Sequence, residues 1–205
     1  MGIFNRKSAE TTATATATAV ATPASPDLAH LTGDYTIDTT HSRIGFAVRH
    51  AMVTNVRGEF AEYTGKLHLD GANPAASTAE LAIQVASIDT GNEQRDGHLR
   101  TGDFFEVEAH PEITFRSTAA EQLDGETYRM TGDLTIKGTT RQVVLDLDFT
   151  GAATDPYGIQ RLGFEGRTVV DRTQFGLSYN AALETGGVLI GEKVKLSFDI
   201  SAVRA

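Results

Sequence analysis

The sequence contains no cysteine in its 205 residues. That absence excludes disulfide bonds, cysteine nucleophiles and thiolate metal sites. Basic residues are also few, because 18 Lys and Arg stand against 27 Asp and Glu, for a formal net charge of −9. This balance argues against nucleic-acid binding, which needs a basic stripe, and against a polybasic hold on anionic lipid. No apolar run approaches the ~20 residues of a transmembrane helix.

The N-terminal 32 residues differ in composition from the rest of the chain. The basic pair Arg6–Lys7 is followed by SAETTATATATAVAT, in which Thr stands at almost every second position. A secretory signal needs an apolar core of about 7–15 residues after its basic start. We therefore expect a disordered Ala/Thr-rich tail over residues 1–32 and one folded domain over residues 33–205. A cleaved signal is the alternative.

From Gly33 onward, apolar residues recur at every second position. In the C-terminal segment EKVKLSFDIS, Val194, Leu196, Phe198 and Ile200 share one face. Strict alternation predicts antiparallel strands with one face buried. Turn signals such as Asp-Gly and Pro separate the alternating segments. We count eight strands, at approximately residues 34–50, 57–70, 78–89, 112–119, 126–136, 141–151, 160–171 and 192–203.

Several of these strands are longer than the usual ~5–6 residues. Long strands with one apolar face favour a closed barrel over an open sheet, because closure removes the exposed edges. The sequence therefore predicts an all-β fold built as an eight-stranded antiparallel β-barrel.

Residues 91–106, GNEQRDGHLRTGDFFE, interrupt the alternation. The run begins polar and becomes apolar at Leu99 and at Phe104 and Phe105. We predict a short helical crossover near residues 92–106, whose two aromatic rings plug one end of the barrel. Gly97 and Gly102 limit the helix to one or two turns.

The sequence offers little for catalysis or metal binding. None of its six histidines is paired at the i, i+4 helical spacing or the H-x-H strand spacing that would place two imidazoles on one metal. There is no G-x-S-x-G nucleophile elbow. Paired carboxylates such as Asp146 and Asp148 lie on a solvated strand face. We therefore expect no catalytic residue, no metal and no cofactor.

Polar residues on apolar faces are the more informative candidates. His50 continues the apolar row of residues 44–48 and should point inward at one end of it. We expect the crossover to present the side chains of Arg95, Asp96 and His98 at a mouth of the barrel. In one interpretation Arg95 and Asp96 tie the crossover to the barrel, and His98 bonds a backbone carbonyl. In the other, these groups form a polar ring that holds the head of an amphipathic ligand.

Five motifs in order resemble the YceI-like family of lipid-binding proteins. They are YTIDTTHSRIGFAVRH, IDTGNEQRDGHLRTGDFF, HPEITFRST, GDLTIKGTTRQVVL and DRTQFGLSYN. The resemblance runs from about Tyr35 to the C-terminus. It implies a lipocalin-like barrel with an elongated apolar cavity, a polyisoprenoid or other long-chain lipid as ligand, and a possible homodimer.

The same resemblance implies site residues. Those implied for the ligand head group at the barrel mouth are His41, His50, Arg95, Asp96, His98, Arg172 and Asn180. Those implied for the apolar cavity are Phe46, Val48, Phe115, Leu145, Phe164 and Phe198. Many relatives in this family begin with a signal peptide and act in the periplasm. The Ala/Thr-rich start departs from that pattern, so we expect a cytoplasmic bacterial protein.

Three functions are therefore open. The first is a carrier or sequestering protein for a long-chain amphipathic lipid. The second is an enzyme acting in isoprenoid quinone metabolism. The third is a stress-related barrel whose core is filled by side chains. An eight-stranded barrel can enclose one ligand, and each buried CH₂ contributes roughly 0.8 kcal/mol before entropy costs. These physical arguments favour the first.

Overall fold

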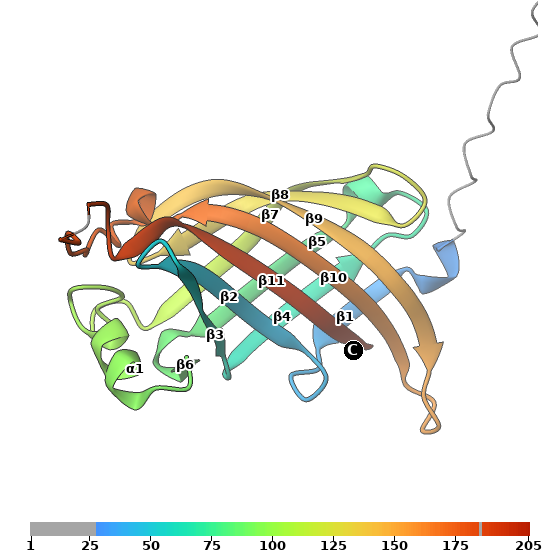
Figure 1. The fold of residues 1–205 in the computed structure, drawn as a ribbon. Coiled ribbons are helices and arrows are strands. Elements are labelled where there is room, and N and C mark those ends of the chain that lie inside the picture. The colour runs from blue at the N-terminus through green and yellow to red at the C-terminus, as the bar shows by residue number, and fades with distance from the viewer. Residues whose placement is uncertain (1–27, 185) are drawn as a thin grey trace, which may run out of the picture.

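A computed structural model describes residues 28–184 and 186–205. It is built almost entirely of strands around one short helix (Figure 1). The strands are β1 Gly33–Ile37, β2 Arg43–His50, β3 Thr54–Phe60, β4 Tyr63–Leu69, β5 Thr78–Gln84, β6 Ile88–Asp89, β7 Glu112–Gln122, β8 Thr127–Ile136, β9 Thr139–Thr154, β10 Gln160–Asp171 and β11 Ile190–Arg204. The helix is α1, Glu93–Arg100; four 3₁₀ turns are η1 Ala29–Leu31, η2 Pro74–Ala76, η3 Val85–Ser87 and η4 Arg172–Phe175.

Eight strands close a barrel, which confirms the predicted fold. The order is β1-β4-β5-β7-β8-β9-β10-β11, and β11 returns to β1 through the antiparallel pair Tyr35 and Arg204. The strands β2, β3 and β6 extend the sheet beside β11. Three predicted strands, at 34–50, 57–70 and 78–89, are thus each broken in two. The first break follows Asp38, whose carboxylate accepts a bond from the Thr40 amide and so stabilises a turn.

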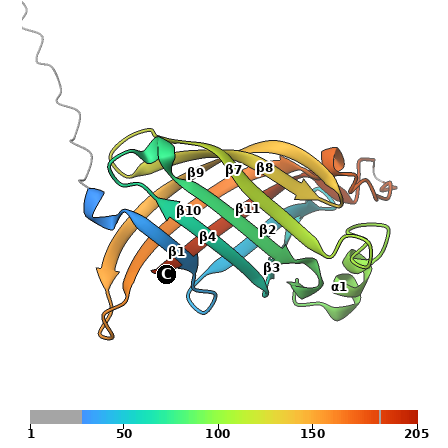
Figure 2. The same cartoon turned by 180° about the vertical axis from the view of Figure 1, so that it is seen from behind.

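At one end of the barrel the sheet has a gap between β6 and β7. Strand β6 pairs with β3 through only Glu59–Asp89 and Phe60–Ile88, and no ladder joins it to β7 among the described residues. The crossover that carries α1 lies at this end of the barrel in both ribbon views (Figures 1 and 2). Near this gap the Arg100 side chain donates to the carbonyls of Ala86 and Ile88, which joins α1 to the segment around β6.

The predicted alternation governs which side chains face inward. Val194, Leu196, Phe198 and Ile200 of β11 all pack against the main buried cluster. Elsewhere an inward ring lies against a glycine of the neighbouring strand. A Cβ built on Gly132 would collide with the Phe115 ring and lie 2.6 Å from a backbone oxygen, so glycine is required there.

The folded domain begins earlier than predicted. Leu28 and Leu31 are only 6% and 2% exposed, and they belong to a second buried cluster with Tyr35 and Leu162. The Tyr35 hydroxyl donates a 2.6 Å bond to the carbonyl of Leu31. Residues 28–32, which we expected in the tail, are thus packed against the barrel through Leu28 and Leu31. The predicted disorder of residues 1–27 lies outside the described residues.

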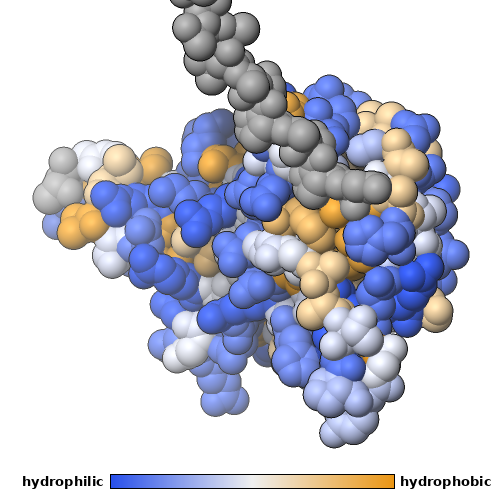
Figure 3. Space-filling model, turned by 90° about the vertical axis from the view of Figure 1, so that its right-hand side faces the viewer, coloured by the Kyte–Doolittle hydropathy of each residue, from blue (hydrophilic) through white to orange (hydrophobic). Residues whose placement is uncertain are grey.

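Figure 3 shows the end of the barrel that lies opposite α1 in Figures 1 and 2. The visible surface there is mainly hydrophilic, with a smaller apolar area.

Candidate functional site

Two apolar cavities lie inside the barrel. The first, of about 180 Å³, occupies the half away from α1 and is lined by inward residues of β5, β7, β8, β9 and β11. The second, of about 290 Å³, lies on the α1 side and is lined by β2, the crossover and the loop after η4. Phe60, Ile113, Ile136 and Leu196 line both cavities. The cavities therefore adjoin, and together they extend along the inside of the barrel.

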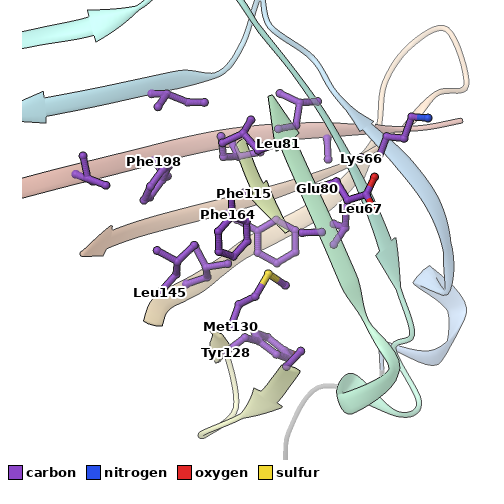
Figure 4. A pocket seen from close by; sticks show the side chains of 18 of the residues that line it. Lys66, Leu67, Glu80, Leu81, Phe115, Tyr128, Met130, Leu145, Phe164 and Phe198 are labelled. Carbon is purple, nitrogen blue, oxygen red and sulfur yellow. The ribbon is translucent and has the colours of Figure 1, made fainter. Parts of the chain in front are cut away.

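All six predicted cavity residues lie in these walls. Phe46 and Val48 line the second cavity. Phe115, Leu145, Phe164 and Phe198 line the first. Figure 4 shows Phe115, Phe164 and Leu145 gathered around the first cavity, with Lys66 pointing away from them. Voids larger than a water molecule are few in a well-packed protein interior, whereas this barrel contains two much larger ones.

The start of the crossover explains Arg95 and Asp96. Helix α1 is capped by Asn92, whose side chain accepts a bond from the Arg95 amide. The Arg95 guanidinium donates to the hydroxyl and carbonyl of Thr90, at 2.7 and 2.8 Å. The carboxylate of Asp96, 6% exposed, accepts from the amide and hydroxyl of the same Thr90. Both side chains therefore join α1 to Thr90, the residue that directly follows β6.

His98 belongs to an aromatic cluster at the α1 end. Its Nε2 lies 2.8 Å from a carboxylate oxygen of Asp103, not from the backbone carbonyl that the structural interpretation expected. Its ring packs edge-on against Phe104 at 5.1 Å and against Tyr179 at 5.0 Å between centroids. These contacts join the crossover to the loop after η4. The helix ends before the two phenylalanines, and both of their rings line the second cavity.

The side chains of Arg172 and Asn180 bond to the backbone of that loop and of the start of β11. The buried guanidinium of Arg172 donates to four carbonyls, those of Leu177, Tyr179, Ile190 and Gly191. Burial lowers the pKa of Arg172, although the nearby Glu192 and Asp171 oppose that shift. The Asn180 amide exchanges two bonds with the backbone of Ile190, at 2.8 and 2.9 Å. Both residues thus shape the mouth, and most of their polar atoms are already bonded to backbone.

His50 and Tyr179 are two polar residues of the second cavity whose side chains make no hydrogen bond to another described residue. Within the described part of the chain, neither the His50 imidazole nor the Tyr179 hydroxyl has a hydrogen-bond partner, whereas Arg95, His98 and Arg172 in the same wall are all engaged. Sequence reasoning identified His50 from its row but missed Tyr179. The available signal was an aromatic residue inside a motif rich in polar residues, DRTQFGLSYN.

His41 lies elsewhere. Its imidazole is 66% exposed and lies 2.7 Å from the carboxylate of Asp38 in the turn between β1 and β2. Asp38 also accepts from Arg161, which pairs in turn with Asp155 beside the β9–β10 hairpin. The bonds from Thr40 and Arg161 hold the pKa of Asp38 far below its usual range. The structure therefore does not bring His41 to the α1 end with the other six mouth residues.

Two further features bear on the site. Among the described residues, no three His, Asp or Glu side chains are grouped closely enough to hold a metal ion. Within residues 28–184 and 186–205, no helix combines the length and the apolar character that a membrane crossing requires.

A family model described as the YceI-like domain matches residues 35–202. The chain belongs to this YceI-like family. A UPF0312 protein of Staphylococcus epidermidis is 38% identical over 169 residues, which cover 82% of this chain and 95% of the relative. A UPF0312 protein of Staphylococcus aureus is 36% identical over 170 residues, with the same coverage.

Several solved structures share the barrel fold. BcnA of Burkholderia cenocepacia superposes with a TM-score of 0.71 at 24% identity, over 80% of this chain and 98% of that one. The YceI protein of Campylobacter jejuni gives 0.67 at 29% identity, over 77% and 90%. A domain from Saccharophagus degradans, described as polyisoprenoid binding, gives 0.63 at 15% identity, over 83% and 98%. The fold and the family predicted from the motifs are both confirmed.

Proposed function

We propose that this YceI-like barrel binds and carries a long-chain lipid with an isoprenoid-type tail and a small, uncharged polar head. The observation that supports this proposal most is the hollow apolar interior, made of two adjoining cavities of about 180 and 290 Å³. A tail is held there by burial alone, at roughly 0.8 kcal/mol per CH₂ before entropy costs. The Saccharophagus domain with the same fold is described as polyisoprenoid binding, which supports this ligand class.

The mouth supports an uncharged head. A diphosphate needs cationic donors that are free to bind it. The guanidiniums of Arg95 and Arg172 already donate to Thr90 and to four carbonyls, and His98 lies against Asp103. The unengaged His50 imidazole and Tyr179 hydroxyl suit a hydroxyl or carbonyl head, which needs one or two neutral hydrogen bonds.

Binding is favoured over the two alternatives. A filled core does not fit cavities of this size. An enzyme of quinone metabolism needs a positioned acid–base or nucleophile pair. In the second cavity, the described titratable side chains are mostly engaged with their own crossover or loop.

Geranylgeraniol and geranylgeranyl diphosphate form a matched pair of probes, because they share a tail and differ in head charge. We expect geranylgeraniol to raise the melting temperature of the full chain and to bind more tightly than the diphosphate. Tyr179→Phe should weaken geranylgeraniol binding by about three- to tenfold, the value of one neutral hydrogen bond. Tyr157→Phe is the control, because Tyr157 is 89% exposed in the β9–β10 turn. Tighter binding of the diphosphate would contradict the proposed head, and binding of neither would contradict the carrier function.

A further inference from the structure

Three apolar side chains project into solvent at the α1 end of the barrel. Met52 and Val53, in the loop between β2 and β3, are 60% and 79% exposed. Val188, in the loop before β11, is 38% exposed. We propose that these three residues, here called the apolar rim, dock the barrel onto a lipid bilayer and place the second cavity against it. The proposal rests on the carrier function proposed above and adds the surface through which lipid is exchanged.

The rim is one connected structure at the cavity entrance. The amide of Ala51 donates a 2.7 Å bond to the carbonyl of Leu189, so the β2–β3 loop is fixed to the loop that carries Val188. Met52 also lies beside Gly187 of that loop. His50 and Leu189, on either side of this junction, line the second cavity, whereas the rim residues do not. A surface bound to the rim therefore lies against the cavity without filling it.

The backbone at the tip gives a second, independent observation. Ala51 and Met52 have φ values of 49° and 61°, and the Val53 amide bonds the carbonyl of His50 across them. Two successive positive φ angles favour Asn and Gly strongly over residues with larger apolar side chains. The turn itself gains nothing from Met52, so an exposed apolar residue in this strained position points to a role outside the fold.

Charge and size favour a bilayer over a protein partner. The tip from Arg49 to Arg57 contains two basic residues and no acidic one, in a chain of net charge −9. Glu184 is the nearest carboxylate in sequence on the Val188 loop. A stable protein interface buries about 800 Å² on each partner, far more than three protruding side chains supply. A bilayer needs only that a few apolar side chains enter its interfacial region.

Docking also answers the kinetic problem of a lipid carrier. When a lipid tail leaves the bilayer through water, each exposed CH₂ lowers the equilibrium constant for transfer from bilayer to water by about fourfold. Contact between the cavity entrance and the bilayer removes that aqueous step, since the tail passes from one apolar phase to another. The rim is placed where such contact is required.

The chain has no tryptophan, so one inserted indole reports its own surroundings. We expect Val53→Trp to shift its fluorescence to shorter wavelength when phosphatidylcholine vesicles are added to the full chain. Tyr157→Trp is the matched control, since Tyr157 is exposed at the opposite end of the barrel. Equal shifts at both positions, or none at Val53→Trp, would overturn the proposal.

The second test changes the rim without weakening the turn. Ala51→Asn with Met52→Gly supplies the residues that positive φ favours, and Val53→Ser removes the remaining apolar tip. This triple variant should melt at or above the wild-type temperature and bind geranylgeraniol in solution as tightly. It should move radiolabelled geranylgeraniol between phosphatidylcholine vesicles at least tenfold more slowly. The reason is that the loss of each apolar side chain lowers the association constant of the protein for the vesicle by about tenfold.

The outcomes separate the two proposals. Unchanged transfer with intact solution binding would overturn the rim and leave the carrier function standing. Failure of the wild type to bind geranylgeraniol in solution would overturn the carrier function, and the Val53→Trp shift would then decide the rim alone. A variant that converts a wild-type dimer to a monomer, with no Val53→Trp shift on vesicles, would overturn docking and make the rim a contact between two copies.

Discussion

Replacing Arg172 by Met tests the idea that the mouth is shaped by a buried cation bonded only to backbone. In this variant the carbonyls of Leu177, Tyr179 and Gly191 lose their side-chain donor, whereas the carbonyl of Ile190 keeps the bond from Asn180. An unsatisfied buried acceptor costs about 1–3 kcal/mol, but the loop after η4 can turn some of these carbonyls to water. Removal of the charge also recovers part of its desolvation cost. We therefore expect a net loss of about 3 kcal/mol in the free energy of unfolding.

For a domain of this size, 1 kcal/mol lowers the melting temperature by roughly 2–4 °C. Thermal unfolding followed by circular dichroism should therefore show a fall of about 6–12 °C for Arg172→Met. Chymotrypsin should cleave after Tyr179 faster, because the carbonyl of that residue is one of the three released. Arg172→Lys should fall between the variant and the wild type, since an ammonium has three donors but lacks the planar fork.

Arg167→Met is the matched control, because Arg167 is exposed on β10, the strand that directly precedes Arg172 and η4. It should change stability by less than about 0.5 kcal/mol. If Arg172→Met melts within about 2 °C of the wild type and resists chymotrypsin equally, the mouth is not held by this residue. The argument for an uncharged ligand head would then lose one of its supports.

Three further predictions concern the rest of the barrel. Leu31→Ala should cost about 2–5 kcal/mol in urea unfolding, whereas removal of residues 1–27 should change little; equal effects would contradict the revised boundary. Gly132→Ala should push the Phe115 ring into the first cavity and weaken geranylgeraniol binding as well as stability, so a fully stable variant with normal binding would show that the ring has room. The pKa of Asp38 is depressed on folding, so its contribution is complete above the unfolded pKa near 4 and is lost progressively as the pH falls from there through the lower, folded pKa. Asp38→Asn should therefore destabilise the protein less at pH 2 than at pH 7, and equal losses at both values would refute that linkage.

The strands could be predicted because their signal is local. A period of two in β11 places Val194, Leu196, Phe198 and Ile200 on one side whatever the rest of the chain does. The same rule placed Phe46 and Val48 in a cavity wall and turned His50 inward. The crossover could be predicted for the same reason, since it is where the period fails.

The roles of the polar residues could not be predicted because their partners are distant or are backbone. The Arg172 guanidinium bonds carbonyls up to 19 residues away, and no sequence pattern marks a carbonyl as an acceptor. His41 was grouped with the mouth, but a turn after Asp38, held by Arg161 from β10, places it elsewhere. Leu28 and Leu31 were hidden by the Ala/Thr-rich composition that precedes them. Their burial depends on Tyr35 and Leu162, which only the closed barrel brings together.

The closure of the barrel also governs how the chain is made. Strand β1 pairs with β11 through Tyr35–Arg204, Thr36–Val203 and Ile37–Ala202, so the ring that β1 begins is completed only by a strand made much later. Contacts between residues so far apart in sequence form slowly, because the loop entropy is lost before the contacts form. Until β11 has been made, the edge of β1 that β11 will cover has no partner. A nascent chain with open strand edges is prone to pair with its neighbours. The same closure that encloses the cavity therefore leaves the nascent chain prone to aggregation until β11 is in place.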